Sequence, residues 1–294
     1  MTGVQTCALP IWLRPDSLAK IQTINDILAE YQAAGYDLSI RQLYYQLVAR
    51  GYIENTQKSY KRTADLVNNA RLAGLIDWDM IADRGRETVT PSTWDSPGEI
   101  IRQAANQFRL DPWQDQDSYL EVMVEKQALE GVLIPVCDQW GVRFTANKGY
   151  SSSSALYEAA KRLAATKAGK ACYILYLGDH DPSGLDMTRD IKERLTMFSK
   201  GPVTVERLAL NYEQVLELKP PENPAKETDS RYKDYLQKYG EASWELDAIE
   251  PRELARLVTE AIKSKITDPQ AWNETQDLQA AMTAQILTIA KQLG

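Results

Sequence analysis

The feature that most constrains the fold is a regular alternation of apolar and amphipathic segments between residues 118 and 210. Strands are predicted for four apolar segments, YLEVMVE, VRFTAN, ACYILYLGD and VTVERLAL. Between them lie segments with helical spacing, KQALEGVLIPVCDQWG, SSSALYEAAKRLAATKAG and SGLDMTRDIKERLTMF. Strands that alternate with helices predict an α/β fold with a mainly parallel sheet covered on both faces. The first helix is expected to bend or end around Pro135, and residues 211–294 are expected to be mostly helical.

Three short helices are predicted before this region, over residues 16–36, 39–51 and 56–74. Ser39 is the expected N-cap of the second helix. They are followed by LIDWDMIADRGRETVTP, whose short apolar pieces predict a small β-wing. Three helices and a wing are the outline of a winged helix. A further helix and a polar linker cover residues 95–118. We therefore expect a winged-helix domain over residues 12–112 and a second domain with C-terminal helices over residues 113–294.

The first residues look foreign to the rest of the chain. TGVQTCALPI resembles the translated read-through of a common sequencing-library adapter, so we expect residues 1–11 to be an artefact. A genuine N-terminal extension is the alternative. A signal peptide is disfavoured because no lysine or arginine precedes the apolar part.

Composition narrows the class of protein. The formal net charge of −7 argues mildly against a nucleic-acid binder, although net charge says little about local patches. The three cysteines, Cys7, Cys137 and Cys172, form no CxxC pair, so neither a zinc site nor a disulfide scaffold is expected and a cytoplasmic location fits. No run of eighteen apolar residues exists, so we expect no membrane-spanning segment.

Acidic residues end two of the predicted strands. Glu125 closes YLEVMVE, and Asp179 and Asp181 close ILYLGDHD. Side chains two apart in a strand lie on one side, so Asp179 and Asp181 point together while His180 faces the other way. If the two strands are neighbours, Glu125 faces the pair at the carboxyl edge of the sheet. A hard cation relieves the repulsion of three carboxylates, so we expect Mg²⁺, with Mn²⁺ as a substitute, and phosphate chemistry.

The DxD pair has a simpler alternative explanation. Asp181-Pro182-Ser183-Gly184 is also a sequence for a turn that starts a helix. A lone DxD favours that interpretation, whereas the separate strand-end Glu125 shifts the balance toward a metal site.

VEK after one strand and LGDHDPSG after another resemble the Toprim domain, in which a strand-end glutamate and a DxD hold magnesium for DNA breakage, joining or priming. The closest resemblance is to the A subunit of topoisomerase VI and the related meiotic double-strand-break protein. The matching residues are Glu125, Lys126, Lys148, Gly149, Tyr150, Asp179, Asp181, Pro182 and Gly184. His180 replaces a small residue of the family pattern, and Ser151 stands where the family often has proline. The resemblance spans roughly residues 38–210 and implies a compact stand-alone A-like protein of phage or bacterial mobile elements.

The same family carries its nucleophilic tyrosine in a segment similar to RQLYYQL. The resemblance implies that Tyr45 is the nucleophile and that Arg41 lies one helical turn away. From the residues alone, Tyr45 is rotated by about 100° from Tyr44, so one ring can be buried and the other exposed. A phenol needs a nearby cation to become a nucleophile, and Arg41 can supply it. The alternative is that both tyrosines pack in the core.

Basic residues on the third helix and the wing are the expected DNA contacts. They are Lys58, Lys61, Arg62, Arg71, Arg84 and Arg86. Near the acidic residues, Lys126, Lys148 and His180 are further expected DNA contacts. A solvated helix face is the alternative explanation for such a run of charge.

The resemblance implies a DNA transesterase like the A subunit of a type IIB topoisomerase, which cuts double-stranded DNA through a 5′-phosphotyrosine. It also implies a homodimer in which Tyr45 of one protomer faces the metal site of the other. An ATPase B-type subunit would be a separate chain, because no Walker-type loop is present. The alternatives are a Toprim nuclease that uses water and a DNA-binding module without catalysis. A bacterial primase is disfavoured because no zinc-ligand cluster accompanies the Toprim-like half.

Overall fold

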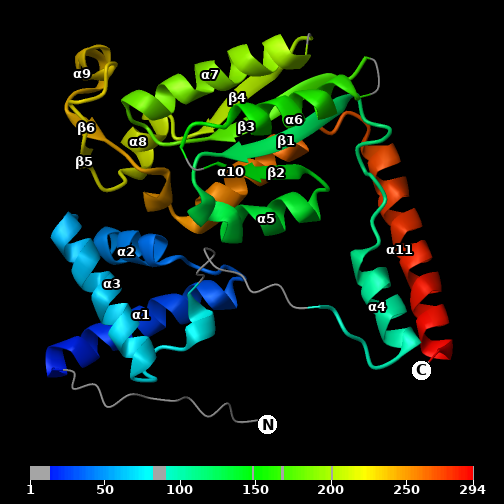
Figure 1. Ribbon diagram of the computed structural model, residues 1–294, viewed down its shortest axis with the longest axis horizontal. Helices are drawn as coiled ribbons and strands as arrows, with labels where there is room; N and C mark the ends of the chain where they lie inside the picture. The colour runs from blue at the N-terminus through cyan, green and yellow to red at the C-terminus, as the bar shows by residue number, and fades with distance from the viewer. Residues whose placement is uncertain (1–13, 82–90, 148, 167–168, 200, 294) are drawn as a thin grey trace.

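The computed structural model has an α/β fold, and the structure describes residues 14–81, 91–147, 149–166, 169–199 and 201–293. Its centre is a four-stranded parallel sheet in the order β2-β1-β3-β4 (Figure 1). The strands are β1 (Ser118–Val124), β2 (Arg143–Ala146), β3 (Ala171–Leu177) and β4 (Thr204–Ala209). The predicted parallel sheet is confirmed. β1 and β3 are neighbours over their whole length, from Ser118 opposite Ala171 to Val124 opposite Leu177.

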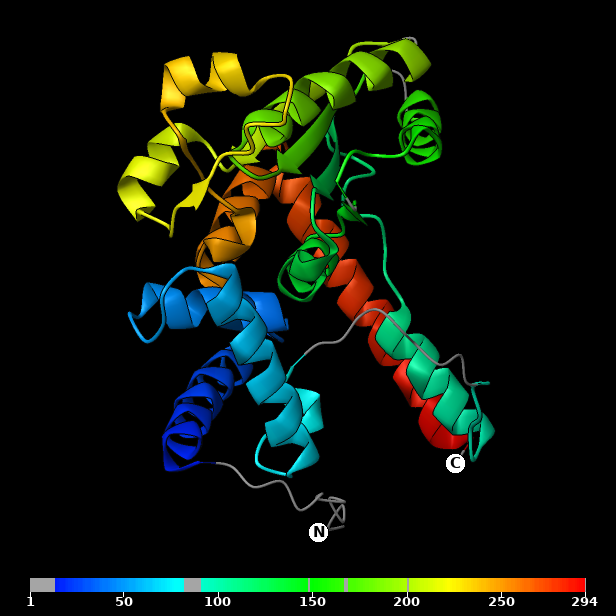
Figure 2. The same cartoon turned by 60° about the vertical axis from the view of Figure 1, so that its left-hand side comes forward.

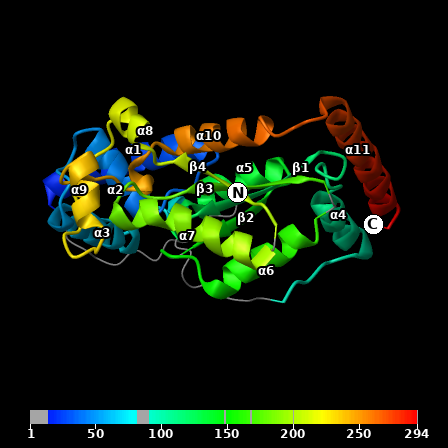
Figure 3. The same cartoon turned by 90° about the horizontal axis from the view of Figure 1, so that it is seen from above.

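Helices cover both faces of the sheet, as the alternating pattern predicted. α5 (Glu130–Gln139) and α10 (Pro251–Lys263) cover one face, and α6 (Ser153–Ala164) and α7 (Pro182–Ser199) cover the other (Figure 3). Alternate residues of β1 enter different cores, Val122 and Val124 on the α5 side and Met123 on the α6 side. α5 contains Pro135 and continues to Gln139, so of the two expectations, a bend or an end around that proline, the helix does not end there.

The front unit, residues 14–81, packs around its own apolar core. Its helices are α1 (Pro15–Ala33), α2 (Ile40–Ala49) and α3 (Gln57–Leu72). Ser39 caps α2 as predicted, because its side chain accepts from the Gln42 amide and the Gln42 side chain accepts from the Ser39 amide. Of the expected wing, the structure describes a short 3₁₀ turn, Trp78–Met80, and a bridge between Leu38 and Ile81. Residues 82–90 lie outside the described residues.

Two helices far apart in the sequence form a projecting pair. α4 (Pro97–Gln107) and α11 (Pro269–Gln292) lie side by side and extend away from the sheet (Figure 2). The described helices include none that is both long and apolar enough to cross a bilayer.

The segment before α10 is less helical than predicted. It contains α8 (Tyr212–Leu218), α9 (Tyr232–Tyr239), the 3₁₀ turn η3 (Leu246–Ala248) and a small antiparallel pair, β5 (Asn223–Pro224) with β6 (Ala242–Ser243). Directly after β6, Trp244 and His180 exchange backbone hydrogen bonds of 3.0 and 2.8 Å. This pairing brings the segment after β6 to the carboxyl end of β3, where the candidate site lies.

Candidate metal centre

The candidate site begins where β1 and β3 end side by side. Glu125 directly follows β1, and Asp179 follows β3 by one residue. The Glu125 carboxylate accepts a hydrogen bond of 2.8 Å from the Asp179 backbone amide. Both side chains are buried. The strands β1 and β3 are neighbours, so these two acids lie together at the carboxyl edge of the sheet, as expected.

Two further acids reach this edge from the segment after β6. The Leu246 backbone amide donates a 2.8 Å hydrogen bond to Asp179 Oδ1. Glu245 and Asp247, the residues before and after Leu246, are thereby brought close to Asp179. One carboxylate oxygen each from Asp179, Glu245 and Asp247 lies within 4.8 Å of the others. We call these three residues the acidic cluster. Carboxylate oxygens at this spacing are suited to a hard divalent cation, so the cluster could hold a metal ion.

Asp247 is the most deeply buried member of the acidic cluster, at 1% exposed. A buried carboxylate normally has hydrogen-bond donors or a cation around it. Its two oxygens are paired with side-chain cations, Arg41 and Lys126. Three carboxylates whose surroundings already balance their charge with cations are a donor set that also fits a Mg²⁺ or Mn²⁺ ion.

Sequence analysis missed Glu245 and Asp247. A signal was present, because WELDA repeats the two-residue spacing of acids seen in GDHDP. The same reasoning that placed Asp179 and Asp181 on one side could have been applied to it. The sequence gives no indication that residue 245 lies close to residue 179 in the folded chain.

Asp181 has a different role from the one expected. Its Oδ1 accepts from the Gly184 amide at 2.6 Å and from the Ser183 hydroxyl at 3.0 Å, at the start of α7. This is the turn at the start of a helix that was the alternative interpretation of the DxD pair. Among the described residues, the acids that converge are therefore Asp179, Glu245 and Asp247, without Glu125 and Asp181.

Gly184 allows this turn to pack against the strand end. A Cβ atom at Gly184 would lie 2.3 Å from the Asp179 carbonyl oxygen and 3.1 Å from Asp181 Oδ1. We expect Gly184→Ala to lower the free energy of unfolding by about 2 kcal/mol, because backbone atoms must shift to make room. Urea denaturation measures the loss. Gly201→Ala is the control, since its Cβ would meet only the Ser199 carbonyl oxygen at 3.9 Å. Equal losses in both variants would contradict the steric argument.

Two cations of the chain occupy the acidic cluster. Lys126 Nζ lies 2.7 Å from Asp179 Oδ2 and 3.4 Å from Asp247 Oδ1, and it also contacts Glu245. Arg41, from α2, places Nη2 2.6 Å from Glu245 and Nε 2.8 Å from Asp247. Lys126 was expected to contact DNA, but the structure points its ammonium group into the cluster.

These charges shift the pKa values of the cluster in opposite directions. Burial is the largest influence on Asp179, and together with the charges of Glu125, Glu245 and Asp247 it holds the pKa of Asp179 well above its usual range, against the attraction of Lys126. Burial likewise raises the pKa of Glu125. For Glu245, burial acts upward, but Lys126 and Arg41 outweigh it and lower the pKa.

The raised pKa of Asp179 predicts how Mn²⁺ affinity depends on pH. A protonated Asp179 is not a metal ligand, so affinity is full above its pKa and falls as the pH drops through it. The loss should begin at a higher pH than for an ordinary aspartate and reach about tenfold per pH unit below the pKa. Titrations of free Mn²⁺ by electron paramagnetic resonance between about pH 8 and pH 5 measure this. An affinity that stays constant over this range would argue against Asp179 as a ligand.

Tyr44 and Tyr45 are both buried, each 3% exposed, which agrees with the alternative that both tyrosines pack in the core. The Tyr44 hydroxyl lies 2.9 Å from Asn55 Oδ1 and 3.1 Å from the Thr56 carbonyl oxygen. The Tyr45 hydroxyl accepts a 3.3 Å hydrogen bond from Asn223. Burial, followed by the charge of Glu245, raises the pKa of Tyr45. Both rings are buried because α2 packs against η3, where Ala248 touches them.

Tyr45 and one member of the acidic cluster, Glu245, line the same pocket. Its volume is about 840 Å³, and its lining includes Arg41, Tyr45, Lys61, Asn223 and Glu245. The Arg41 guanidinium lies 5.8 Å from the centre of the Tyr45 ring. The Arg41 side chain therefore lies near the Tyr45 ring and also contacts two of the acids.

The expected DNA contacts divide into three groups. Lys58, Lys61 and Arg62 are exposed on α3. Arg71 is buried and donates to the carbonyl oxygens of Trp78 and Ile81, so the expectation that it contacts DNA is wrong. The remaining basic residues of the predicted set, Arg84, Arg86 and Lys148, lie outside the described residues.

His180 is also unavailable to DNA. It is 1% exposed and packs against aromatic rings, namely Tyr212, Tyr235, Tyr239 and Trp244. Burial, followed by the charge of Arg207, lowers its pKa to about 4, so the ring is neutral near pH 7. We therefore assign His180 a packing role that supports the chain after β6.

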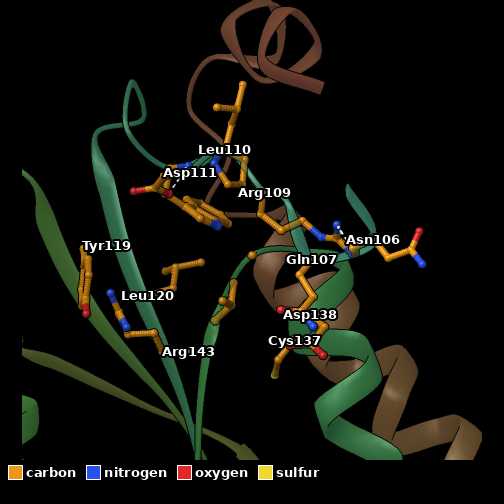
Figure 4. Close-up of a pocket in the computed structure, with 14 residues that line it drawn as sticks. Asn106, Gln107, Arg109, Leu110, Asp111, Tyr119, Leu120, Cys137, Asp138 and Arg143 are labelled. Carbon is orange, nitrogen blue, oxygen red and sulfur yellow. Dashed lines mark hydrogen bonds between the residues drawn. The ribbon is translucent and has the colours of Figure 1, made fainter. Parts of the chain in front are cut away.

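A second pocket lies away from the acids. Its volume is about 610 Å³, and Tyr119 and Arg143, at the amino ends of β1 and β2, line it together with Arg109 (Figure 4). The acidic cluster lies at the carboxyl ends of the strands. This pocket therefore contributes no group to the candidate metal centre.

Comparisons of the chain with models of protein families, with curated proteins and with solved structures found no match. The function is therefore inferred from the residues of the site.

Proposed function

We propose that the chain is a metal-dependent DNA transesterase of the winged-helix and Toprim type, with Tyr45 as its nucleophile. The observation that carries this proposal is the position of Arg41. It lies one turn before Tyr45 on α2 and contacts both Glu245 and Asp247. A tyrosine, an arginine and a cluster of metal-binding acids are thus held together, which is the set of groups that phosphoryl transfer to a tyrosine requires.

Each residue has a defined part in this reaction. The Tyr45 oxygen bonds to a backbone phosphorus atom, the bond from that phosphorus to the 3′ oxygen breaks, and the protein remains on the 5′ phosphate. Water in the pocket that Tyr45 and Glu245 line takes up the phenolic proton, and water protonates the departing 3′ oxygen. Arg41 faces the charge that develops on the phosphate. Asp179, Glu245 and Asp247 would hold Mg²⁺, which supplies Lewis-acid stabilisation of the phosphate when bound.

The DNA surface is proposed to run along α3. Lys58, Lys61 and Arg62 are exposed there, and Lys61 also lines the Tyr45 pocket. Lysine and arginine side chains at this position can neutralise phosphates of double-stranded DNA. The homodimer and a separate ATPase subunit remain part of the proposal through the resemblance to topoisomerase VI.

A nuclease that uses water is the second candidate. The burial of Tyr45 and its raised pKa favour this candidate, because a phenol enclosed in this way is neither accessible to DNA nor easily ionised. In that case Tyr45 is a packing residue and the acidic cluster alone supports cutting.

Supercoiled plasmid incubated with the protein and Mg²⁺ or Mn²⁺, then denatured with and without protease, tests the proposal. A transesterase gives nicked or linear DNA that stays bound to protein until protease is added. Cut DNA that is free of protein supports the nuclease. Binding without cutting in either metal contradicts both enzymes.

A further inference from the structure

Polar and apolar contacts both attach the front unit to the rest of the chain. Besides the Arg41 ion pairs, the Tyr31 hydroxyl lies 3.1 Å from Glu250, and the Asn55 side chain donates to the Glu222 carbonyl oxygen. The apolar contacts include Tyr44 and Tyr45 with Ala248, and Tyr36 against the core of the sheet. Interfaces between units of one chain resemble those of transient complexes, so relative movement of the two parts is the default expectation.

The Arg41 contact reaches the acidic cluster, where Lys126 also lies. Lys126 Nζ contacts all three carboxylates, and Arg41 contacts two of them. Two positive groups therefore stand where a divalent cation would be held. A cation and these side chains cannot share the same oxygens, because the carboxylates cannot satisfy both at contact distance.

We propose that Arg41 and Lys126 form an autoinhibitory latch on the metal centre. In the latched state both side chains neutralise the acidic cluster, and Arg41 also holds α2 against η3, which keeps Tyr45 buried. When a divalent cation binds, Lys126 withdraws from the three carboxylates and Arg41 leaves Glu245 and Asp247, so that the front unit separates and Tyr45 becomes accessible. This inference rests on the proposed function, since it describes the regulation of the same site.

The latch couples metal affinity to the position of the front unit. A ligand that binds the open state better than the closed state shifts the population toward the open state. The coupling is reciprocal, so a change that weakens the latch must strengthen metal binding. It also accounts for a nucleophile that is 3% exposed in this structure.

Arg41→Met, compared with Arg50→Met, tests the latch without DNA. Arg50 also lies at α2 but pairs with Glu30 inside the front unit, so its loss leaves the cluster unchanged. We expect Arg41→Met to bind Mn²⁺ about tenfold more tightly than the wild type, and Arg50→Met to bind it equally. The free Mn²⁺ signal in electron paramagnetic resonance gives both affinities. Circular dichroism confirms that each variant is folded.

Hydrogen exchange supplies the second measurement. In the wild type, Mn²⁺ should speed exchange of the α2 amides while those of β1 stay protected. In Arg41→Met, α2 should exchange quickly before metal is added. Equal affinities together with unchanged exchange of α2 would overturn the latch.

The latch and the proposed function fail separately. If Arg41→Met binds Mn²⁺ more tightly but the wild-type protein never cuts plasmid, the proposed function fails and the latch stands. Protein-linked cleavage by the wild type with identical Mn²⁺ affinity in Arg41→Met removes the latch and keeps the function.

Discussion

Tyr45→Phe is expected to abolish the covalent protein–DNA product, lowering its yield about a thousandfold or more, because the oxygen that forms the bond is gone. The substitution leaves the ring and its packing in place. It removes only one 3.3 Å hydrogen bond with Asn223, so the loss of stability should be about 1 kcal/mol. Labelled DNA trapped on the protein under denaturing conditions measures the product.

Tyr44→Phe is the matched control. Tyr44 is the adjacent residue on α2 and equally buried, but its hydroxyl is engaged by Asn55 and Thr56. We expect this variant to retain most of the adduct.

Asp179→Asn should lose adduct and cutting together, because the candidate metal centre loses a ligand. If Tyr45→Phe still formed adducts, Tyr45 would not be the nucleophile. If Tyr45→Phe cut DNA at the wild-type rate and neither protein formed an adduct, the nuclease would be the correct function.

Arg162→Met is expected to lower the free energy of unfolding by about 3 kcal/mol, because it leaves a buried carboxylate without its cation. Glu121, on β1, has a fully buried side chain, and Arg162 of α6 donates to both of its oxygens at 2.8 Å. The Tyr119 hydroxyl, at 2.7 Å, is the remaining donor. The Arg162 side chain is 35% exposed, so water can reach the gap, which places the expected loss at the low end of the range for such pairs.

Two variants separate the ion pair from general packing. Lys161→Met changes the neighbouring residue, whose ion pair with Glu158 is on the surface, and should leave stability nearly unchanged. Glu121→Gln combined with Arg162→Met should recover part of the loss, since a neutral amide is buried at lower cost than a carboxylate. Urea denaturation of the four proteins gives the comparison. A double variant no more stable than Arg162→Met would show that packing, and not the unpaired charge, causes the loss.

The proposed latch bears on the proposed homodimer. In this structure Tyr45 lines a pocket with Glu245 of its own chain, whereas the resemblance to topoisomerase VI implies delivery to a second protomer. Release of Arg41 would free the front unit to place Tyr45 at either site. Mixing Tyr45→Phe and Asp179→Asn proteins can distinguish these arrangements, because only exchange between protomers restores the adduct.

Local and neighbouring patterns determined much of the fold. The short, mostly apolar runs of β1 and β3, and the helical periods between them, predicted a parallel sheet with both faces covered. The position of acids directly after those strands predicted that Glu125 and Asp179 meet at one edge. These inferences succeed because they depend on residues close in sequence and on the general geometry of parallel strands.

The composition of the metal centre was decided by tertiary structure. Glu245 and Asp247 join Asp179 through a backbone pairing between Trp244 and His180, which are more than sixty residues apart and carry no local signal of contact. The burial of Tyr45 and the capture of Arg41 depend on how α2 docks against η3, and helical periodicity cannot specify that docking. Periodicity shows which face of an element is buried. Long-range packing chooses the partner, and with it the charges that surround each acid.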